Sequence, residues 1–199
     1  LIPRPGSPWG GVGYRRGAFV VPTAGGSQRG SEARGKIMDP KEHVRQVTDL
    51  LSDLVEGTDD GQLDDDTPCE DFRVRDLIGH FTFGRSLFGA IMGGDTARRD
   101  ELLGGMPAQF GDVVGDDHRA AFRSATAELD AALDGVGDLD EEVDSLLFGT
   151  LPLGVLTQIL SGDNLLHCWD LARGTGQAFD APDDVVEATP MAAEGEDDA

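Results

Sequence analysis

The segment that most constrains the fold is the longest stretch of the chain with helical periodicity, residues 153–173. Apolar side chains recur there every three or four residues, which sets them on one side of an α-helix. They include Val155, Leu156, Ile159, Leu160, Leu166 and Leu171. The pattern predicts one long helix from about Leu153 to Arg173, ended by Gly174 as its C-cap.

Three other segments show the same periodicity, over residues 39–56, 74–92 and 116–133. The first begins with Asp39 as a capping residue, Pro40 at the first helical position and Glu42 where a capping-box acid belongs. The second is expected to stop at Gly93 and Gly94. Four helices of this length with long connections predict an all-α fold, a four-helix bundle.

The connections between these helices carry little periodicity. A short helical turn is expected at residues 98–103. Residues 145–148 are expected to form a short strand or extended segment before the last long helix, and residues 183–188 a second short turn of helix. The organisation predicted is a disordered, Gly- and Pro-rich extension over residues 1–37, a bundle over 38–180, and an acidic, mostly disordered tail over 181–199. Met38 precedes a well-formed helix start, so we expect it to be the natural first residue.

The formal charge of −22 is unevenly distributed. Residues 1–37 hold six basic residues and one acidic residue, which leaves 10 basic and 37 acidic residues in the remainder, a net charge of −27. Such a body repels nucleic acid and anionic membranes, so neither is expected as a partner. No apolar run approaches the roughly 18–20 residues that cross a bilayer. With two cysteines, Cys69 and Cys168, there is no disulfide framework, and the expected location is the cytoplasm.

One pair of residues in the long segment suggests chemistry. Asp163 and His167 are four residues apart, so their side chains leave the same face of a helix. The pair is a candidate for holding a divalent metal if a third ligand comes from another element, and His80 is that third candidate. A hydrogen bond or ion pair without metal is the alternative. Three protein ligands leave a coordination position open, and imidazole favours Zn²⁺, with Ni²⁺, Fe²⁺ and Mn²⁺ as alternatives.

Other polar and aromatic residues have weaker claims. His43 and His118 lie among charged neighbours in first helical turns and are predicted to be exposed, whereas Trp169 is predicted to pack at a helix contact. Asp170 is a candidate to orient a ligand, with an exposed helical position as the alternative. Cys69 is a candidate to approach the site, with a buried structural thiol as the favoured alternative. The arginines Arg73, Arg75, Arg85 and Arg173 are candidates for holding a carboxylate, with structural ion pairs as the alternative.

Two motifs carry a family resemblance. Residues 67–80 (TPCEDFRVRDLIGH) and residues 163–173 (DNLLHCWDLAR) resemble the two hallmarks of the mycothiol-dependent maleylpyruvate isomerase N-terminal-domain family. That family belongs to the DinB-like, or YfiT-like, superfamily of metal-dependent four-helix bundles. The resemblance covers about residues 39–180. It implies a metal held by His80, Asp163 and His167, with Asp163 where the isomerase itself carries Glu.

The resemblance also implies a function. The expectation is a divalent-metal protein that uses a low-molecular-weight thiol, mycothiol in the isomerase, in a transferase or isomerase reaction on a small electrophile. The isomerase continues further beyond the second motif, so the resemblance implies the helical core and not a complete substrate pocket. The alternative is a non-catalytic metal-binding or structural bundle, and a homodimer formed through a helix pair fits that alternative.

Overall fold

The computed structural model describes residues 38–70 and 72–189. The predictions made for residues 1–37 and 190–199, including their disorder, lie outside the described residues. The described chain contains helices α1 (Pro40–Glu56), α2 (Val74–Met92), α3 (Thr96–Gly104), α4 (His118–Gly135), α5 (Leu153–Thr175) and α6 (Asp183–Ala188). Two 3₁₀ segments, η1 (Asp60–Gln62) and η2 (Phe110–Val114), and two short strands, β1 (Glu142–Asp144) and β2 (Thr150–Pro152), lie in the connections.

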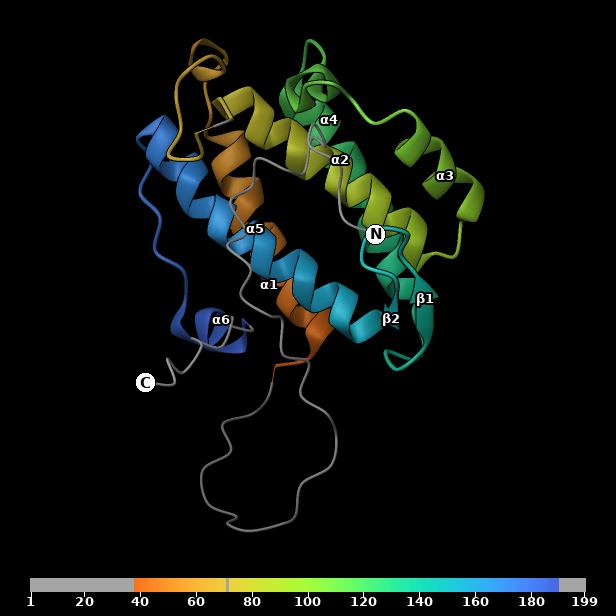
Figure 1. The fold of residues 1–199 in the computed structure, drawn as a ribbon. Coiled ribbons are helices and arrows are strands. Elements are labelled where there is room, and N and C mark those ends of the chain that lie inside the picture. The colour runs from red at the N-terminus through yellow and green to blue at the C-terminus, as the bar shows by residue number, and fades with distance from the viewer. Residues whose placement is uncertain (1–37, 71, 190–199) are drawn as a thin grey trace, which may run out of the picture.

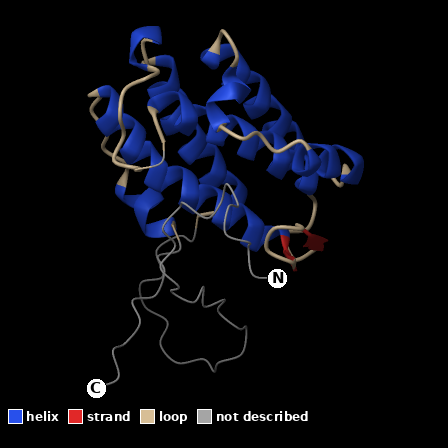
Figure 2. Cartoon of the chain, turned by 45° about the horizontal axis from the view of Figure 1, so that its top comes forward, coloured by secondary structure: helices blue, strands red, loops and turns tan. Residues whose placement is uncertain are grey.

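Four long helices form the bundle. Both α1 and α2 pack against α4 and α5, so each long helix has two helical neighbours (Figure 1). Helix α3 lies outside the bundle against α2, and α6 packs on α1. Almost all regular structure is helical, with the strand pair confined to one corner of the molecule (Figure 2). The prediction of an all-α bundle with long connections is confirmed.

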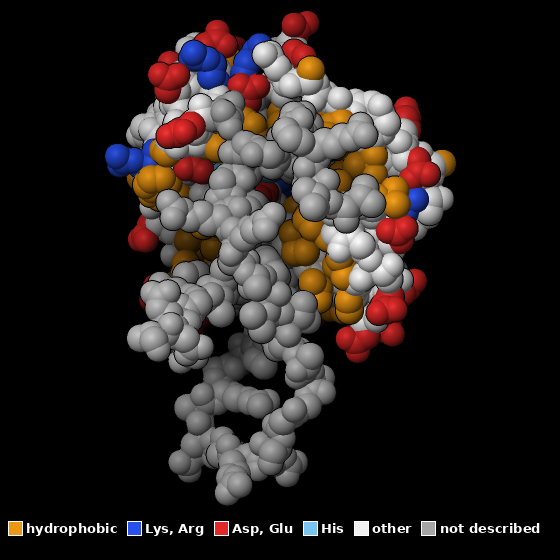
Figure 3. Space-filling model, viewed as in Figure 1, with side chains coloured by type: hydrophobic (Ala, Val, Ile, Leu, Met, Phe, Trp, Pro, Cys, Tyr) orange, Lys and Arg blue, Asp and Glu red, His pale blue; other side chains and the backbone are white. Residues whose placement is uncertain are grey.

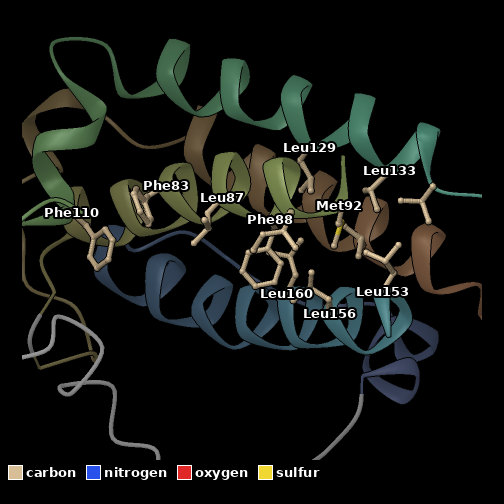
Figure 4. Packing of buried hydrophobic residues seen from close by; sticks show 13 residues of the cluster. Phe83, Leu87, Phe88, Met92, Phe110, Leu129, Leu133, Leu153, Leu156 and Leu160 are labelled. Carbon is tan, nitrogen blue, oxygen red and sulfur yellow. The ribbon is translucent and has the colours of Figure 1, made fainter. Parts of the chain in front are cut away.

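Helix α2 is the most deeply buried of the four, because 15 of its 19 residues are buried. Its residues Leu87, Phe88 and Met92 point between the leucines of α4 and those of α5 (Figure 4). A second apolar cluster nearer the start of α2 includes Leu77, Ile78 and Phe81. The helical periodicity of residues 74–92 had predicted an apolar face on this helix.

Local signals account for the start of α1 and the end of α2. The Asp39 side chain accepts hydrogen bonds from the backbone N–H groups of Lys41 and Glu42, at 3.0 and 3.2 Å, as a capping residue does. Glu42 does not reach back to the cap; its carboxylate accepts a hydrogen bond from Gln46 instead. Helix α2 ends at Gly93, as predicted.

Two local predictions near α5 are wrong. Residues 145–148 form the turn between β1 and β2, which pair as antiparallel strands with Val143 opposite Leu151. The chain reverses there because Leu146 and Gly149 both take positive φ angles. Helix α5 also continues past Gly174 to Thr175, and Gly176 is its left-handed cap, at φ 70°.

The predicted exposure of His43 and His118 is wrong, since both side chains are buried. Helix α6 covers His43, whose Nε2 lies 3.0 Å from the backbone oxygen of Val185. His118 is covered by the segment after α1, and its Nδ1 lies 3.7 Å from a carboxylate oxygen of Asp60. The prediction that Trp169 packs at a helix contact is also wrong, because its side chain is 52% exposed.

The described helices include none with the length and apolar character that crossing a membrane requires.

We predict that Gly79→Ala destabilises the bundle, because a Cβ at Gly79 would lie 1.9 Å from the backbone oxygen of Phe110. Overpacking of this kind costs about 1–3 kcal/mol in the free energy of unfolding. Gly84 is the matched control on the same helix, because a Cβ there meets nothing within 4 Å. Gly84→Ala is expected to stabilise the protein by about 0.5–1 kcal/mol, since alanine is the better helix former. Urea unfolding of both variants measures the difference, and equal effects would contradict the close approach at Gly79.

We predict that His43 makes the fold sensitive to mild acid. Burial lowers the pKa of His43, and the hydrogen bond to the Val185 carbonyl only partly opposes this effect. The unfolded chain therefore binds a proton more readily than the folded chain. The stability contributed by neutral His43 is complete above the usual histidine value of about 6.5 and is lost as the pH falls through the lower folded-state value.

His43→Gln removes the titration but keeps a donor for Val185. Urea unfolding between pH 8 and pH 5 is expected to show a smaller loss of stability in this variant than in the wild type. Parallel pH dependences for the two proteins would be the opposite result.

Candidate metal centre

His80, Asp163 and His167 lie together between α2 and α5. One ligand atom from each residue can be chosen so that all three lie within 4.8 Å of one another. His80 Nε2 is 3.1 Å from Asp163 Oδ2, and His167 Nε2 is 3.8 Å from Asp163 Oδ1. The structure thus brings together the three residues that the sequence suggested, one from α2 and two from α5.

The two helices position these side chains for different reasons. On α5, the four-residue spacing sets Asp163 and His167 one turn apart at the edge of the apolar face. On α2, His80 follows Gly79, where η2 approaches so closely that only a hydrogen fits. That approach lays the Phe110 ring against the His80 ring, with centroids 5.3 Å apart and planes at 84°.

Asp170 determines how His167 is oriented. Its carboxylate oxygen Oδ2 lies 2.8 Å from His167 Nδ1, one helical turn further along α5. With Nδ1–H donating to Asp170, the lone pair of Nε2 is directed toward Asp163. Asp170 is therefore hydrogen-bonded to His167 and is not an exposed helical residue, since its side chain is only 16% exposed.

The environment of Asp163 favours the charged carboxylate. Burial by itself opposes ionisation, but the hydrogen bond from His80 and the electrostatic influence of His80, His167 and Arg85 together hold the pKa of Asp163 below its usual value. Its side chain remains 24% exposed, whereas those of His80 and His167 are 5% and 8% exposed. Asp163 is thus an ionised acceptor that reaches solvent at the edge of a buried histidine pair.

Aromatic rings enclose the two histidines. The Phe72 ring centroid lies 5.7 Å from that of His80 and 6.5 Å from that of His167. The Phe81 ring lies 6.1 Å from His167 on the side of the bundle interior. We did not predict these contacts from the sequence. The available signal was that Phe72 lies in the same motif as His80.

The donor set fits a divalent cation. Imidazole nitrogen and carboxylate oxygen both bind zinc at about 2.0–2.2 Å, so two ligands of a tetrahedral ion lie roughly 3.3 Å apart. The separations of 3.1 and 3.8 Å around Asp163 are close to that value. The orientation of His167 by a carboxylate is the arrangement that commonly supports a histidine ligand.

The remaining arginines and the two cysteines have the following environments. Arg85 is fully buried, with its guanidinium carbon 4.5 Å from the centre of the Phe122 ring of α4. Burial lowers the pKa of Arg85 to about 10, so it stays charged at neutral pH. Arg173 is exposed beside Trp169. Cys69 is half-buried in the loop before α2, and burial raises the pKa of the Cys168 thiol to about 12.

A four-helix bundle with a His/Asp/His cluster between two of its helices defines a helical-bundle protein with a candidate divalent-metal centre. The chain belongs to the mycothiol maleylpyruvate isomerase N-terminal domain family, whose model matches residues 44–172. His80, Asp163, His167 and Asp170 all lie inside the matched range.

Individual relatives are more distant. The uncharacterized proteins Rv0738 and MT0763, from two strains of Mycobacterium tuberculosis, are each 30% identical to this chain over 146 residues. The match covers 72% of this chain and 71% of each relative. The crystal structure of the mycothiol-dependent maleylpyruvate isomerase superposes with a TM-score of 0.58 at 18% identity, over 76% of this chain and 68% of that one. A histidine-to-alanine mutant of that enzyme gives 0.56 at 17% identity with the same coverage. These structures share the fold.

Proposed function

We propose that this protein binds a divalent metal, Zn²⁺ as first choice, through His80, Asp163 and His167. We further propose that it acts as a thiol-dependent transferase or isomerase on a small electrophile, with mycothiol as the thiol. The observation that carries the proposal is the cluster of three ligand atoms within 4.8 Å, in a chain of the isomerase domain family. Within this proposal the protein is cytoplasmic.

The chain's own residues prepare the site in three ways. Asp163 is held ionised and His167 is held with its Nε2 lone pair toward Asp163, so both are ready to act as ligands. The Phe72 and Phe110 rings cover one side of the histidines and limit the access of water. A divalent metal bound there would supply a Lewis acid that lowers the pKa of a thiol and makes it a nucleophile at neutral pH. Three protein ligands leave room for that thiol.

A second function has one observation in its favour. The 3.1 Å contact from His80 Nε2 to Asp163 is a good hydrogen bond without any metal, so the cluster also suits a structural bundle. The two functions differ in whether metal is bound and whether a thiol reacts.

The first test replaces the ligands. Wild-type protein is expected to hold about one metal per chain by elemental analysis after dialysis, and His80→Ala and His167→Ala are expected to hold none, because a two-ligand site binds weakly. His43→Gln is the matched control, since it removes a buried histidine outside the cluster. Wild type without stoichiometric metal would overturn the proposal. Metal retained with no thiol-dependent turnover, on maleylpyruvate or other electrophiles, would favour a non-catalytic module.

The second test concerns the orientation of His167. Asp170→Asn keeps the size of the side chain but removes the carboxylate that holds Nδ1–H. Metal affinity is expected to fall about 10–100-fold, as it does when such supporting carboxylates are lost. The measurement is competition for metal against a chromophoric chelator. Asp138→Asn, at an exposed position in the connection before β1, is the control that is expected to keep wild-type affinity. Equal affinities in all three proteins would remove Asp170 from the site.

A further inference from the structure

A pocket of about 920 Å³ opens beside the first turn of α2. Its walls come from the loop before α2 with the first turn of that helix, and from η2 with the two residues before it, and Phe72 and Phe110 are among its lining residues. The same two rings contact the ring of His80. Phe72 and Phe110 therefore form an aromatic wall that borders both the pocket and His80 of the cluster.

The charge of the pocket is strongly negative. Five carboxylates line it, against two guanidinium groups. Arg73 Nη1 lies 3.2 Å from Asp66, and Arg75 Nε lies 3.8 Å from Asp64, so each guanidinium has a carboxylate beside it. The three carboxylates in excess are those of Glu70, Asp76 and Asp112.

Those three carboxylates are not alike. The Asp76 side chain accepts hydrogen bonds from the backbone N–H groups of Arg73 and Gly111, at 3.2 and 2.9 Å, so it holds the walls together. Glu70 and Asp112 are exposed, and within residues 38–70 and 72–189 no hydrogen bond or ion pair engages either side chain. These two carboxylates are available to a ligand.

The aromatic wall adds a second, independent feature. Phe72 and Phe110 meet edge to face, with ring centroids 5.9 Å apart and planes at 80°. Phe72 is half-buried, so part of its surface faces the pocket. The face of an aromatic ring attracts a cation, and the attraction grows where water is excluded. Carboxylates and an aromatic ring lining one pocket are a combination that suits an ammonium group.

We propose that this pocket binds a small molecule that carries an ammonium group, held by Glu70 and Asp112 and by the ring of Phe72. The inference rests on the proposed function, because it specifies the charge of the substrate that would bind beside the His/Asp/His cluster. It also distinguishes this chain from an enzyme that acts on dicarboxylates, because the excess negative charge of the pocket would repel a dianion.

The rest of the molecule reinforces this selectivity. Asp and Glu side chains occur around the periphery of the face shown in Figure 3, with fewer Lys and Arg among them. A field of that sign concentrates cations near the surface and depletes anions. Arg85 offers an anion no help in the pocket, because it is fully buried against Phe122.

The test uses three probes of similar size and different charge: benzylammonium, benzyl alcohol and benzoate. Each is titrated into the full-length, metal-free protein at low ionic strength, and the backbone amide signal of Gly111 is followed by NMR. Benzylammonium is expected to bind at least about tenfold more tightly than benzoate, with benzyl alcohol between them. Added salt is expected to weaken benzylammonium binding, because it screens exposed charges.

Matched variants test the residues. Glu70→Gln with Asp112→Asn removes two charges from the pocket without removing a hydrogen bond within the described residues, and is expected to weaken benzylammonium binding about fivefold or more. Glu141→Gln with Asp140→Asn makes the same change of charge beside β1 and is expected to leave binding unchanged. Thermal unfolding of both double variants checks that each is folded.

Several results would overturn the inference. They are equal or tighter binding of benzoate, no shift of the pocket amides with any probe, or a pocket variant that binds like the wild type. The outcome is independent of the metal, because all titrations use metal-free protein. A protein that binds benzylammonium but no metal would refute the proposed function alone, and one that binds metal but not benzylammonium would refute the inference alone.

Discussion

The close packing of α2 against its neighbours is the constraint on which the site depends. Gly79 has no side chain, so η2 can lie directly on α2 and carry Phe110 over His80. On the other side α5 brings Asp163, whose ionised carboxylate is costly to bury and is stabilised by two histidines and the charge of Arg85. The contacts that close the bundle at this end are therefore the contacts that assemble the cluster.

Charge is arranged differently inside and outside this bundle. The interior holds few ionisable groups, and one of them, Arg85, is stabilised by an aromatic face and by distant carboxylates. The surface carries most of the 38 acidic residues of the chain. The acidic shell around an interior with few charges favours cations near the surface, in the same sense as the excess carboxylates of the pocket beside the cluster.

Much of the fold and of the candidate site was predictable because the signals are local. Caps and glycines delimit α1 and α2, and the period of apolar residues identifies most of the core face of the long helices. Leu166 is an exception, because it was placed with the apolar residues of α5 and is 70% exposed. Asp163 and His167 were predictable as a pair from their spacing. His80 was identified by its motif, since no local pattern can link residues 83 positions apart.

The sequence by itself determined the four long helices, most of their apolar faces and the three candidate ligands. Only the tertiary structure decided which of these side chains are covered: α6 buries His43, the segment after α1 buries His118, and Trp169 stays half exposed beside Arg173. The pocket beside the cluster is likewise a product of two distant segments. The physical reason for this difference is that apolar periodicity predicts which residues share a face of a helix. Whether that face is buried depends on which other element packs on it.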